Sequence, residues 1–442
     1  AGVSWSALML SFALSPAWVR TAMAEESLPP INAQTEAAFG KLLAHSGVRR
    51  AIEFIRSDDE RTLKEQIEIT EIPAPPFKEQ IRAADYLRRL RQLGFADARI
   101  DAEGNVLALR RGSGGDRAPL LVLAAHLDTV FPAGTDVRVK VSGNRYAAPG
   151  IYDDGRGLAS LLSVVRALNE TRLTTVGHVL FVGNVGEEEL GDLRGVKALF
   201  RDTPGIDGFI SLDGLDIGRI VNQGTGSRRW RIVYKGPGGH SFAAFGLPSA
   251  THAMGRAIAR ISDVRTPSEP KTTFTVGTVR GGTSVNAIAA DAEIGLDMRS
   301  NSAEELKRLE ERILALAREA ADEENRRWGR PDVIKVEFHL VGDRPAGAGD
   351  VNQPIVHAAR RSVVAVGGEV KAVSASSTDS NLPISLGIPA VTLGSGGVGG
   401  GSHGPGEWYS PLNAWVGPQS TLLTVLSLVG IDGVTEPLLR KR

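Results

Sequence analysis

Residues 119–128 read Pro-Leu-Leu-Val-Leu-Ala-Ala-His-Leu-Asp, and this stretch decides the class of fold that the sequence predicts. Its first seven residues are almost uniformly apolar, which is typical of a strand buried on both faces of a parallel sheet. The run ends on His126 and Asp128, whose spacing puts both side chains on the same side of an extended segment. Such an Asp can hold an imidazole in the tautomer that leaves its other nitrogen free for a metal. Taken alone, the pair is more often a solvated loop Asp beside a satisfied His.

Further apolar runs of the same kind follow along the chain, with helical patterns between them. We predict buried strands at residues 179–185, 209–212 and 389–393. Helices are predicted within residues 34–93 and at residues 158–168, where the apolar positions recur with helical spacing or fill a whole segment. Strands that alternate with helices predict an α/β sandwich built on a mostly parallel sheet.

Residues 226–341 break this rhythm. The elements predicted there are strands at 228–235, 272–280, 291–298 and 333–340, with helices at 249–261 and from Ser302 onward. Ser302 and Glu305 have the spacing of a capping box at the start of the second helix. The order β-α-β-β-α-β is the ferredoxin-like layout. We therefore predict a catalytic domain in two parts, residues 25–225 and 342–442, with a smaller α+β domain inserted between them.

The composition is that of a globular protein with more than one domain. A chain of 442 residues is too long to fold around one simple hydrophobic core. Lys plus Arg equals Asp plus Glu, at 51 each, so the charge balance indicates neither nucleic acid nor an anionic membrane as a partner. The chain contains no cysteine, which excludes disulfides, thiolate nucleophiles and thiolate-bound metals. Any metal must therefore be held by histidines and carboxylates.

The N-terminal segment, residues 1–24, differs from the rest of the chain. An apolar stretch from Val3 to Val19 is followed by Ala22 and Ala24, the small residues that precede a signal-peptidase site. We expect a cleaved signal peptide and hence a periplasmic or secreted mature protein. The alternative is a disordered or anchoring N-terminal arm, and without a signal the protein would be cytoplasmic. No later run approaches the roughly 20 apolar residues of a membrane span, so we expect none in the mature chain.

A histidine or a carboxylate follows almost every predicted strand, or begins a predicted helix. These residues are His126, Asp128, Asp153, Asp154, Glu187, Glu188, Glu189, Asp213 and His403. Singly they are weak signals, because such residues also cap helices, form charged loops or decorate a surface. Ligands of open α/β sheets bind outside the carboxyl ends of the strands, so we expect these side chains to meet at one edge. Two histidines and three carboxylates would suit a pair of divalent ions, which a carboxylate can bridge.

The motifs resemble those of the M20 metallopeptidase family, in order and in context, from about residue 60 to residue 425. The matching segments are His126-Leu127-Asp128, Gly150-Ile151-Tyr152-Asp153-Asp154, Gly186-Glu187-Glu188, Asp213 and His403. The resemblance implies a zinc-exopeptidase-like sandwich with an inserted lid and dimerisation domain, and two zinc ions per subunit that cobalt or manganese can replace. It assigns His126 and Asp213 to the first metal, Glu188 and His403 to the second, and Asp153 to both as the bridge.

The resemblance also implies roles around the metals. Glu187 would be the general base that takes a proton from a metal-bridged water, and Asp128 would be the partner that orients His126. In the inserted domain, His240 resembles the lid histidine that polarises the scissile carbonyl in a neighbouring subunit. Asn286 resembles a substrate-contacting Asn, and Arg299 resembles the Arg that grips a substrate carboxylate. A homodimer through the lid domain is therefore expected.

The expected activity is the removal of residues from short peptides. In the family, an Asp at the position of Asp213 goes with aminopeptidases and tripeptidases, whereas a Glu goes with carboxypeptidases and deacylases. Arg299 would serve either a peptide C-terminus or an N-acyl amino acid, so a deacylase or carboxypeptidase acting on N-acyl amino acids is the alternative. A metal-stabilised peptide-binding protein without catalysis is an alternative of another class. The chain departs from the family at Glu189, where a Gly is common.

Overall fold

The computed structural model describes residues 28–442. The predicted signal peptide at residues 1–24 lies outside the described residues, so the location that depends on it stays a prediction. All elements below belong to the compact unit Ile31–Arg442. Among the helices of the described range, none combines the length and the apolar character that crossing a bilayer requires.

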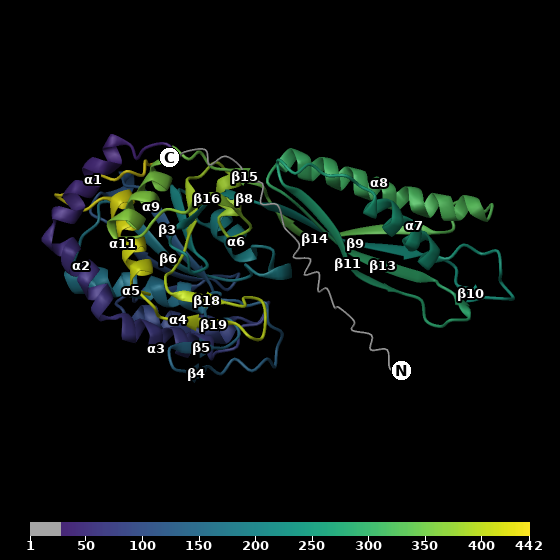
Figure 1. Ribbon diagram of the computed structural model, residues 1–442, viewed down its shortest axis with the longest axis horizontal. Helices are drawn as coiled ribbons and strands as arrows, with labels where there is room; N and C mark the ends of the chain where they lie inside the picture. The colour runs from purple at the N-terminus through teal and green to yellow at the C-terminus, as the bar shows by residue number, and fades with distance from the viewer. Residues whose placement is uncertain (1–27) are drawn as a thin grey trace, which may run out of the picture. The chain divides into compact units, whose positions relative to one another are not determined.

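A nine-stranded sheet forms the centre of this unit (Figure 1). Four neighbouring strands in its middle run parallel. They are β6 (His178–Asn184), β3 (Leu120–His126), β7 (Gly208–Leu212) and β17 (Ala390–Leu393). The flanking strands are β1 (Arg99–Ile100), β2 (Val106–Arg110), β8 (Arg219–Gly224), β15 (Gly347–Ala348) and β16 (Ala372–Ser376). The prediction of an α/β fold around a largely parallel sheet is confirmed, and each central strand lies within two residues of its expected bounds.

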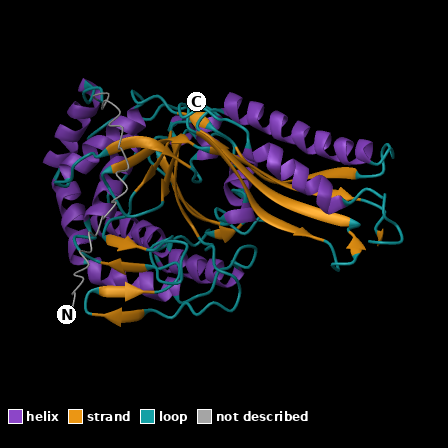
Figure 2. Cartoon of the chain, turned by 45° about the vertical axis from the view of Figure 1, so that its right-hand side comes forward, coloured by secondary structure: helices purple, strands orange, loops and turns teal. Residues whose placement is uncertain are grey.

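Both faces of the central sheet are covered by helices, and strand β3 shows why its sequence is continuously apolar. Successive side chains of a strand point to opposite faces. Accordingly, Leu121, Leu123 and Ala125 belong to one apolar cluster, and Val122 and Ala124 to another. Seven helices contribute to the first cluster: α1 (Ala33–Ala44), α2 (Ser46–Ser57), α3 (Asp59–Thr70), α4 (Gln80–Gln92), α5 (Gly155–Thr171), α9 (Pro354–Ala365) and α11 (Val416–Val429). The second cluster includes residues of α6 (Arg194–Asp202) and α10 (Asn381–Ser385). Figure 2 shows helices packed around the sheet.

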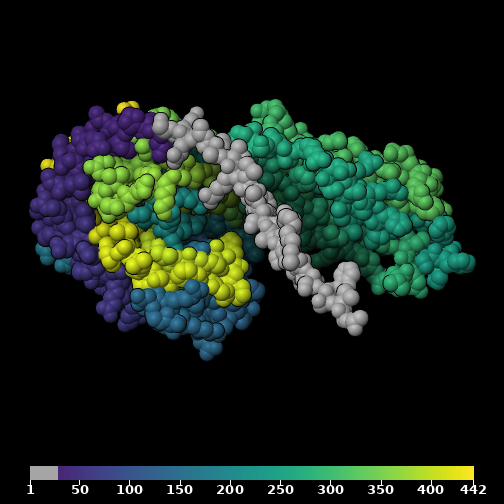
Figure 3. Space-filling view, in the orientation of Figure 1, coloured from purple at the N-terminus to yellow at the C-terminus, as the bar shows by residue number. Residues whose placement is uncertain are grey.

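A small second sheet brings together two loops that are far apart in the sequence. It has the order β18-β19-β5-β4, with all neighbours antiparallel. Its strands are β4 (Lys140–Ser142), β5 (Arg145–Ala147), β18 (Val398–Gly400) and β19 (Trp408–Ser410). Figure 3 shows the two parent segments, coloured blue and yellow, side by side. The pairing sets the loop that carries His403 beside the loop that carries Asp153.

Between β8 and β15 the chain forms an α+β layer of its own. A four-stranded antiparallel sheet has the order β11-β13-β9-β14. Its elements in chain order are β9 (Gly226–Lys235), α7 (Ala250–Ser262), β11 (Thr272–Gly281), β13 (Asp291–Ser300), α8 (Ala303–Arg327) and β14 (Lys335–Arg344). The hydroxyl of Ser302 accepts a hydrogen bond from the backbone N–H of Glu305 and caps α8. Sheet and helices enclose a separate apolar core that includes Ile232, Ile294 and Ile313.

The chain crosses into and out of this inserted segment at two adjacent points. Strand β8 passes into β9 at Thr225, and β14 passes into β15 at Pro345. The side-chain amide of Asn381 donates hydrogen bonds to the carbonyls of both, at 2.8 Å for Thr225 and 3.1 Å for Pro345. One side chain outside the inserted segment therefore ties the two crossing points together.

Arg82 on α4 joins three pieces of backbone close to the carboxyl end of β3. Its fully buried guanidinium donates to the carbonyls of Thr70 and Ile72 and, at 2.8 Å, to that of Leu127. Leu127 stands between His126 and Asp128 in the sequence. Burial lowers the pKa of Arg82 to about 10, despite the nearby carboxylates, so the guanidinium remains charged at neutral pH.

Replacing Arg82 by Met is expected to lower the free energy of unfolding by about 3 kcal/mol, because three buried carbonyls lose their donors. Urea unfolding followed by circular dichroism measures the change. Arg88→Met on the same helix is the matched control, since Arg88 is half exposed and pairs only at the surface. We expect the control to shift stability by no more than about 1 kcal/mol. Equal effects of the two variants would contradict this role of Arg82.

Candidate active site

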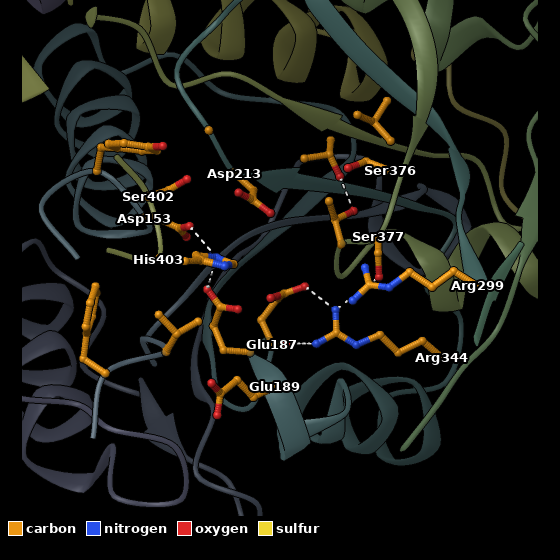
Figure 4. A pocket seen from close by; sticks show the side chains of 18 of the residues that line it. Asp153, Glu187, Glu189, Asp213, Arg299, Arg344, Ser376, Ser377, Ser402 and His403 are labelled. Atoms are coloured by element: carbon orange, nitrogen blue, oxygen red, sulfur yellow. Dashed lines mark hydrogen bonds and ion pairs between the residues drawn. The ribbon is translucent and has the colours of Figure 1, made fainter. Parts of the chain in front are cut away.

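Asp153 lies between the two histidines predicted as metal ligands. One of its carboxylate oxygens is 3.1 Å from Nε2 of His126, and the other is 3.2 Å from Nε2 of His403. Nε2 of His403 is also 3.2 Å from Oε1 of Glu188. Figure 4 shows Asp153, Asp213 and His403 directed toward one another. A carboxylate whose two oxygens face different histidines has the arrangement of a group that bridges two cations.

All five predicted ligands meet in two overlapping sets. His126, Asp153 and Asp213 offer ligand atoms that lie within 4.8 Å of one another, and so do Asp153, Glu188 and His403. Asp153 is common to both sets. His126, Glu187 and Glu188 form a third set with the same spacing. Imidazole and carboxylate donors at these separations fit a pair of divalent ions such as zinc.

The pKa values of these groups are shifted because several ionisable side chains lie close together with little exposure to solvent. Burial, reinforced by Asp153, raises the pKa of Asp213 to about 7. Hydrogen bonds to Asp153 and Glu188 raise the pKa of His403 to about 10. Burial alone would lower the pKa of His126, but its hydrogen bonds to Asp128 and Asp153 outweigh burial and raise that pKa well above the ordinary value. Metal ligation requires neutral imidazoles and ionised carboxylates, so binding of a cation by these groups would be coupled to the release of protons.

Asp128 fixes the loop that follows β6. Its carboxylate accepts the backbone N–H of Glu187 at 3.1 Å and that of Glu188 at 2.8 Å. Nδ1 of His126 lies 3.0 Å from the backbone carbonyl of Asp128 and 3.7 Å from the carboxylate. The predicted neighbour of His126 is therefore in place, and its carboxylate also holds the two glutamates that follow the next strand.

Two further carboxylates hold the loop of Asp153. Asp154 caps α5, accepting the N–H of Gly157, and also accepts the N–H of His126 at 2.9 Å. Glu407 is buried and accepts the backbone N–H groups of Gly150, Tyr152 and Asp153, at 2.9, 2.9 and 3.1 Å. Sequence reasoning gave Glu407 no role. The only signal available was its position four residues beyond His403.

Glu187 has a partner that the sequence analysis missed. Its Oε1 lies 3.0 Å from Nη1 of Arg344, and Nη2 of Arg344 donates to the backbone carbonyl of Glu187. Both side chains are at most 7% exposed. Burial raises the pKa of Glu187 well above its ordinary value, even though Arg344 acts in the opposite direction. A buried carboxylate with a raised pKa beside these candidate metal ligands is suited to accept a proton.

A cleft of about 750 Å³ opens over the cluster and extends to the base of the inserted segment. One wall carries Asp153, Glu187, Glu188, Asp213 and His403. The other carries cationic and hydroxyl groups from Arg219, Arg229, Arg299, Arg344, Ser376, Ser377 and Thr378. Nε of Arg299 is 2.8 Å from Asp297, and its side chain is 42% exposed, so the guanidinium can reach a ligand in the cleft.

His240 and Asn286 lie together, away from this cleft. His240 ends β10 (Gly239–His240), which pairs with β12 (Ala287–Ile288), and Asn286 immediately precedes β12. The N–H of Ser241 donates to the carbonyl of Asn286 at 2.9 Å. Both side chains are exposed, and neither lines the cleft of its own chain. The structure thus places Arg299 near the cluster but does not bring His240 or Asn286 to it.

Glu189 occupies the position where the family commonly has a glycine. Its backbone φ is 46°, in the left-handed region that glycine adopts most readily. In this conformation the backbone carbonyl of Glu189 accepts a hydrogen bond from Arg229.

Comparison with known proteins gives a consistent family and fold. The model of peptidase family M20/M25/M40 matches residues 122–423. Carboxypeptidase G2 from Pseudomonas is 31% identical over 107 residues, which are 23% of this chain and 25% of that protein. A succinyl-diaminopimelate desuccinylase from Burkholderia mallei is 26% identical over 252 residues, 52% of this chain and 66% of the relative. The chain thus spans a quarter to about two thirds of these relatives.

Solved structures show the same fold. A tripeptidase from Staphylococcus aureus superposes with a TM-score of 0.68 at 22% identity, over 83% of this chain and 97% of that one. An aminopeptidase from Bacillus cereus gives a TM-score of 0.67 at 23% identity, over 83% and 98% of the two chains. A further neighbour, from Bacillus subtilis, is described as a dinuclear metal-binding peptidase, with a TM-score of 0.61 at 19% identity over 85% of this chain and 99% of that one.

Proposed function

This chain belongs to peptidase family M20/M25/M40, whose members are metal-dependent peptidases and amidohydrolases, and from that membership we propose that it is a two-metal exopeptidase acting on short peptides. The observation that carries the proposal is the position of Asp153, with one oxygen toward His126 and the other toward His403. A single carboxylate so placed is explained by two cations better than by one.

The donor set fits two zinc ions. His126, Asp153 and Asp213 would hold the first, and Asp153, Glu188 and His403 the second. With no cysteine in the chain, these oxygen and nitrogen donors also accept cobalt or manganese. When bound, the ions would polarise the scissile carbonyl and make water more acidic.

Proton transfer and substrate binding would be carried out by side chains of the protein. Glu187 would take a proton from the attacking water and pass it to the leaving amine. Asp128 holds the backbone of Glu187, so that the carboxylate faces the cluster. Arg299 would bind a carboxylate of the substrate and fix which bond lies over the cluster, a task that suits a planar guanidinium.

We assign residues 226–341 as a lid and dimerisation domain, between catalytic parts at residues 25–225 and 342–442. Its separate apolar core and its two adjacent crossing points support this division. His240 and Asn286 are exposed and do not line their own cleft. In a homodimer they would serve the cleft of the partner subunit, His240 by polarising the scissile carbonyl.

Free tripeptides are expected to be cleaved faster than the same tripeptides with an acetylated N-terminus, because Asp213 stands where aminopeptidase-type members carry Asp. The test is a panel of matched free and blocked peptides, run on zinc-loaded and cobalt-loaded protein and followed by chromatography of the products. Faster cleavage of the blocked series would instead support the deacylase or carboxypeptidase alternative. Tight capture of peptides without hydrolysis by the metal-loaded protein would instead indicate a binding protein.

A further inference from the structure

Arg344 holds the proposed base from two directions. One nitrogen pairs with the Glu187 carboxylate at 3.0 Å, and another donates to the backbone carbonyl of the same residue. The nitrogen that pairs with the carboxylate also donates to Ser377 at 3.2 Å. Figure 4 shows Arg344 reaching Glu187 from the side opposite His403. The guanidinium therefore restrains both the side chain and the main chain of Glu187.

Arg344 lies at the junction between the inserted segment and the second catalytic part. It is the last residue of β14, where it pairs with Ser227, and it immediately precedes the crossing point at Pro345. The amide of Asn381 ties that point to the other crossing at Thr225. A shift of β14 relative to the central sheet would move the backbone from which Arg344 extends.

A second arginine of the same segment contacts the same loop. Arg229 on β9 donates to the backbone carbonyl of Glu189 and pairs with Asp297 at 3.0 Å. The loop that carries the base and a metal ligand is thus joined to the inserted segment by two guanidinium groups. Of these, Arg344 alone contacts the Glu187 carboxylate.

We propose that Arg344 is a positioning residue, which holds the Glu187 carboxylate toward the cluster and makes its alignment depend on the position of the inserted segment. The proposal rests on the function assigned to Glu187 above. A carboxylate attached by single bonds has several rotamers, and an ion pair at one oxygen selects among them. A displacement of about 1 Å at a reacting group lowers turnover by about 100-fold. The expected consequence is a defect in kcat rather than in KM.

The test compares Arg344→Gln with Arg344→Lys, and with Arg228→Gln as matched control. Arg228 lies on the neighbouring strand, pairs with Asp343 at 3.0 Å and does not line the cleft. We expect Arg344→Gln to lower kcat by about 100-fold with KM changed less than about threefold. Arg344→Lys should retain part of kcat, since an ammonium can replace one of the two contacts. Arg228→Gln should keep kcat within about twofold.

Two measurements separate positioning from general damage. Amide hydrogen exchange of the peptide containing residues 186–192 should accelerate in Arg344→Gln and stay unchanged in Arg228→Gln. Metal content should remain at two ions per chain, and added guanidinium should restore part of kcat to Arg344→Gln. If Arg344→Gln does not fold, kcat and hydrogen exchange of Arg344→Lys provide the test.

Unchanged kcat and unchanged exchange in both Arg344 variants would overturn the inference. A rise in KM confined to substrates with an additional carboxylate would also overturn it, because Arg344 would then be a substrate-binding group. The result that defeats the positioning role of Arg344 differs from the result that defeats the proposed function. An inactive Glu187→Gln with a fully active Arg344→Gln defeats only the positioning role, whereas an active Glu187→Gln defeats the function itself.

Discussion

Glu187→Gln is expected to lower kcat by about 10²–10⁴-fold while the protein keeps two metal ions per chain. The amide has nearly the shape of the carboxylate and retains the hydrogen bond from Arg344, but it cannot accept a proton from water. The backbone N–H of Glu187 stays bound to Asp128, so the loop should keep its conformation. Steady-state kinetics on the best substrate of the panel, with metal analysis of the same sample, measures the effect.

Glu189→Gln is the matched control for this variant. Glu189 is two residues further along the same loop and belongs to none of the ligand sets found among residues 28–442. We expect this control to retain kcat within about threefold, because its carboxylate has no assigned part in proton transfer. Turnover of Glu187→Gln near that of the unaltered protein would remove the proposed mechanism.

Asp153→Ala is expected to abolish binding of at least one metal ion and to lower kcat by about 10³-fold or more. The carboxylate is shared by both ligand sets, so its removal leaves each with only two of its three donors. The two histidines also lose the negative charge that lies between them. Metal analysis by mass spectrometry after dialysis against a trace of zinc measures the loss directly.

Thermal unfolding provides a second measurement of the Asp153 variant. A ligand that binds only the folded protein adds about 2.7 kcal/mol of stability at a concentration 100 times its Kd. Zinc should therefore raise the unfolding temperature of the unaltered, chelator-treated protein much more than that of Asp153→Ala. Asp216→Ala, which removes an exposed ion pair with Lys371, is the control and should respond to zinc like the unaltered protein. An Asp153→Ala variant with two tightly held ions would contradict the bridging role.

The central strands were predictable because each is apolar at most of its positions. That pattern results from helices on both faces of the sheet, and β3 divides its side chains between two apolar clusters. Helix α11 was not predicted for a related reason. All its residues from Gly417 to Val429 are buried, so no polar face gives it a helical period. The strands of two or three residues, such as β4 and β18, are too short to leave a pattern and exist only through their partners.

The predicted metal ligands could be located because parallel strands deliver their carboxyl ends to one edge. His126 ends β3 and Glu188 follows β6, which pairs with β3. Arg344 and Glu407 could not be located in this way. Arg344 meets Glu187 across 157 positions of sequence, and Glu407 meets Gly150 across 257. Contacts of that range depend on how the inserted segment and the small second sheet pack, which no local pattern encodes.

The small second sheet has a consequence for how the protein matures. His403 supplies a ligand atom, and Glu407 anchors the loop of Asp153, yet both are translated some 250 positions after that Asp. A nascent chain on the ribosome therefore presents His126, Asp153 and Asp213 long before the second ligand set can close. Loading of the proposed second metal site would therefore have to follow synthesis of residue 403, and a product truncated before that residue would lack one donor of the site.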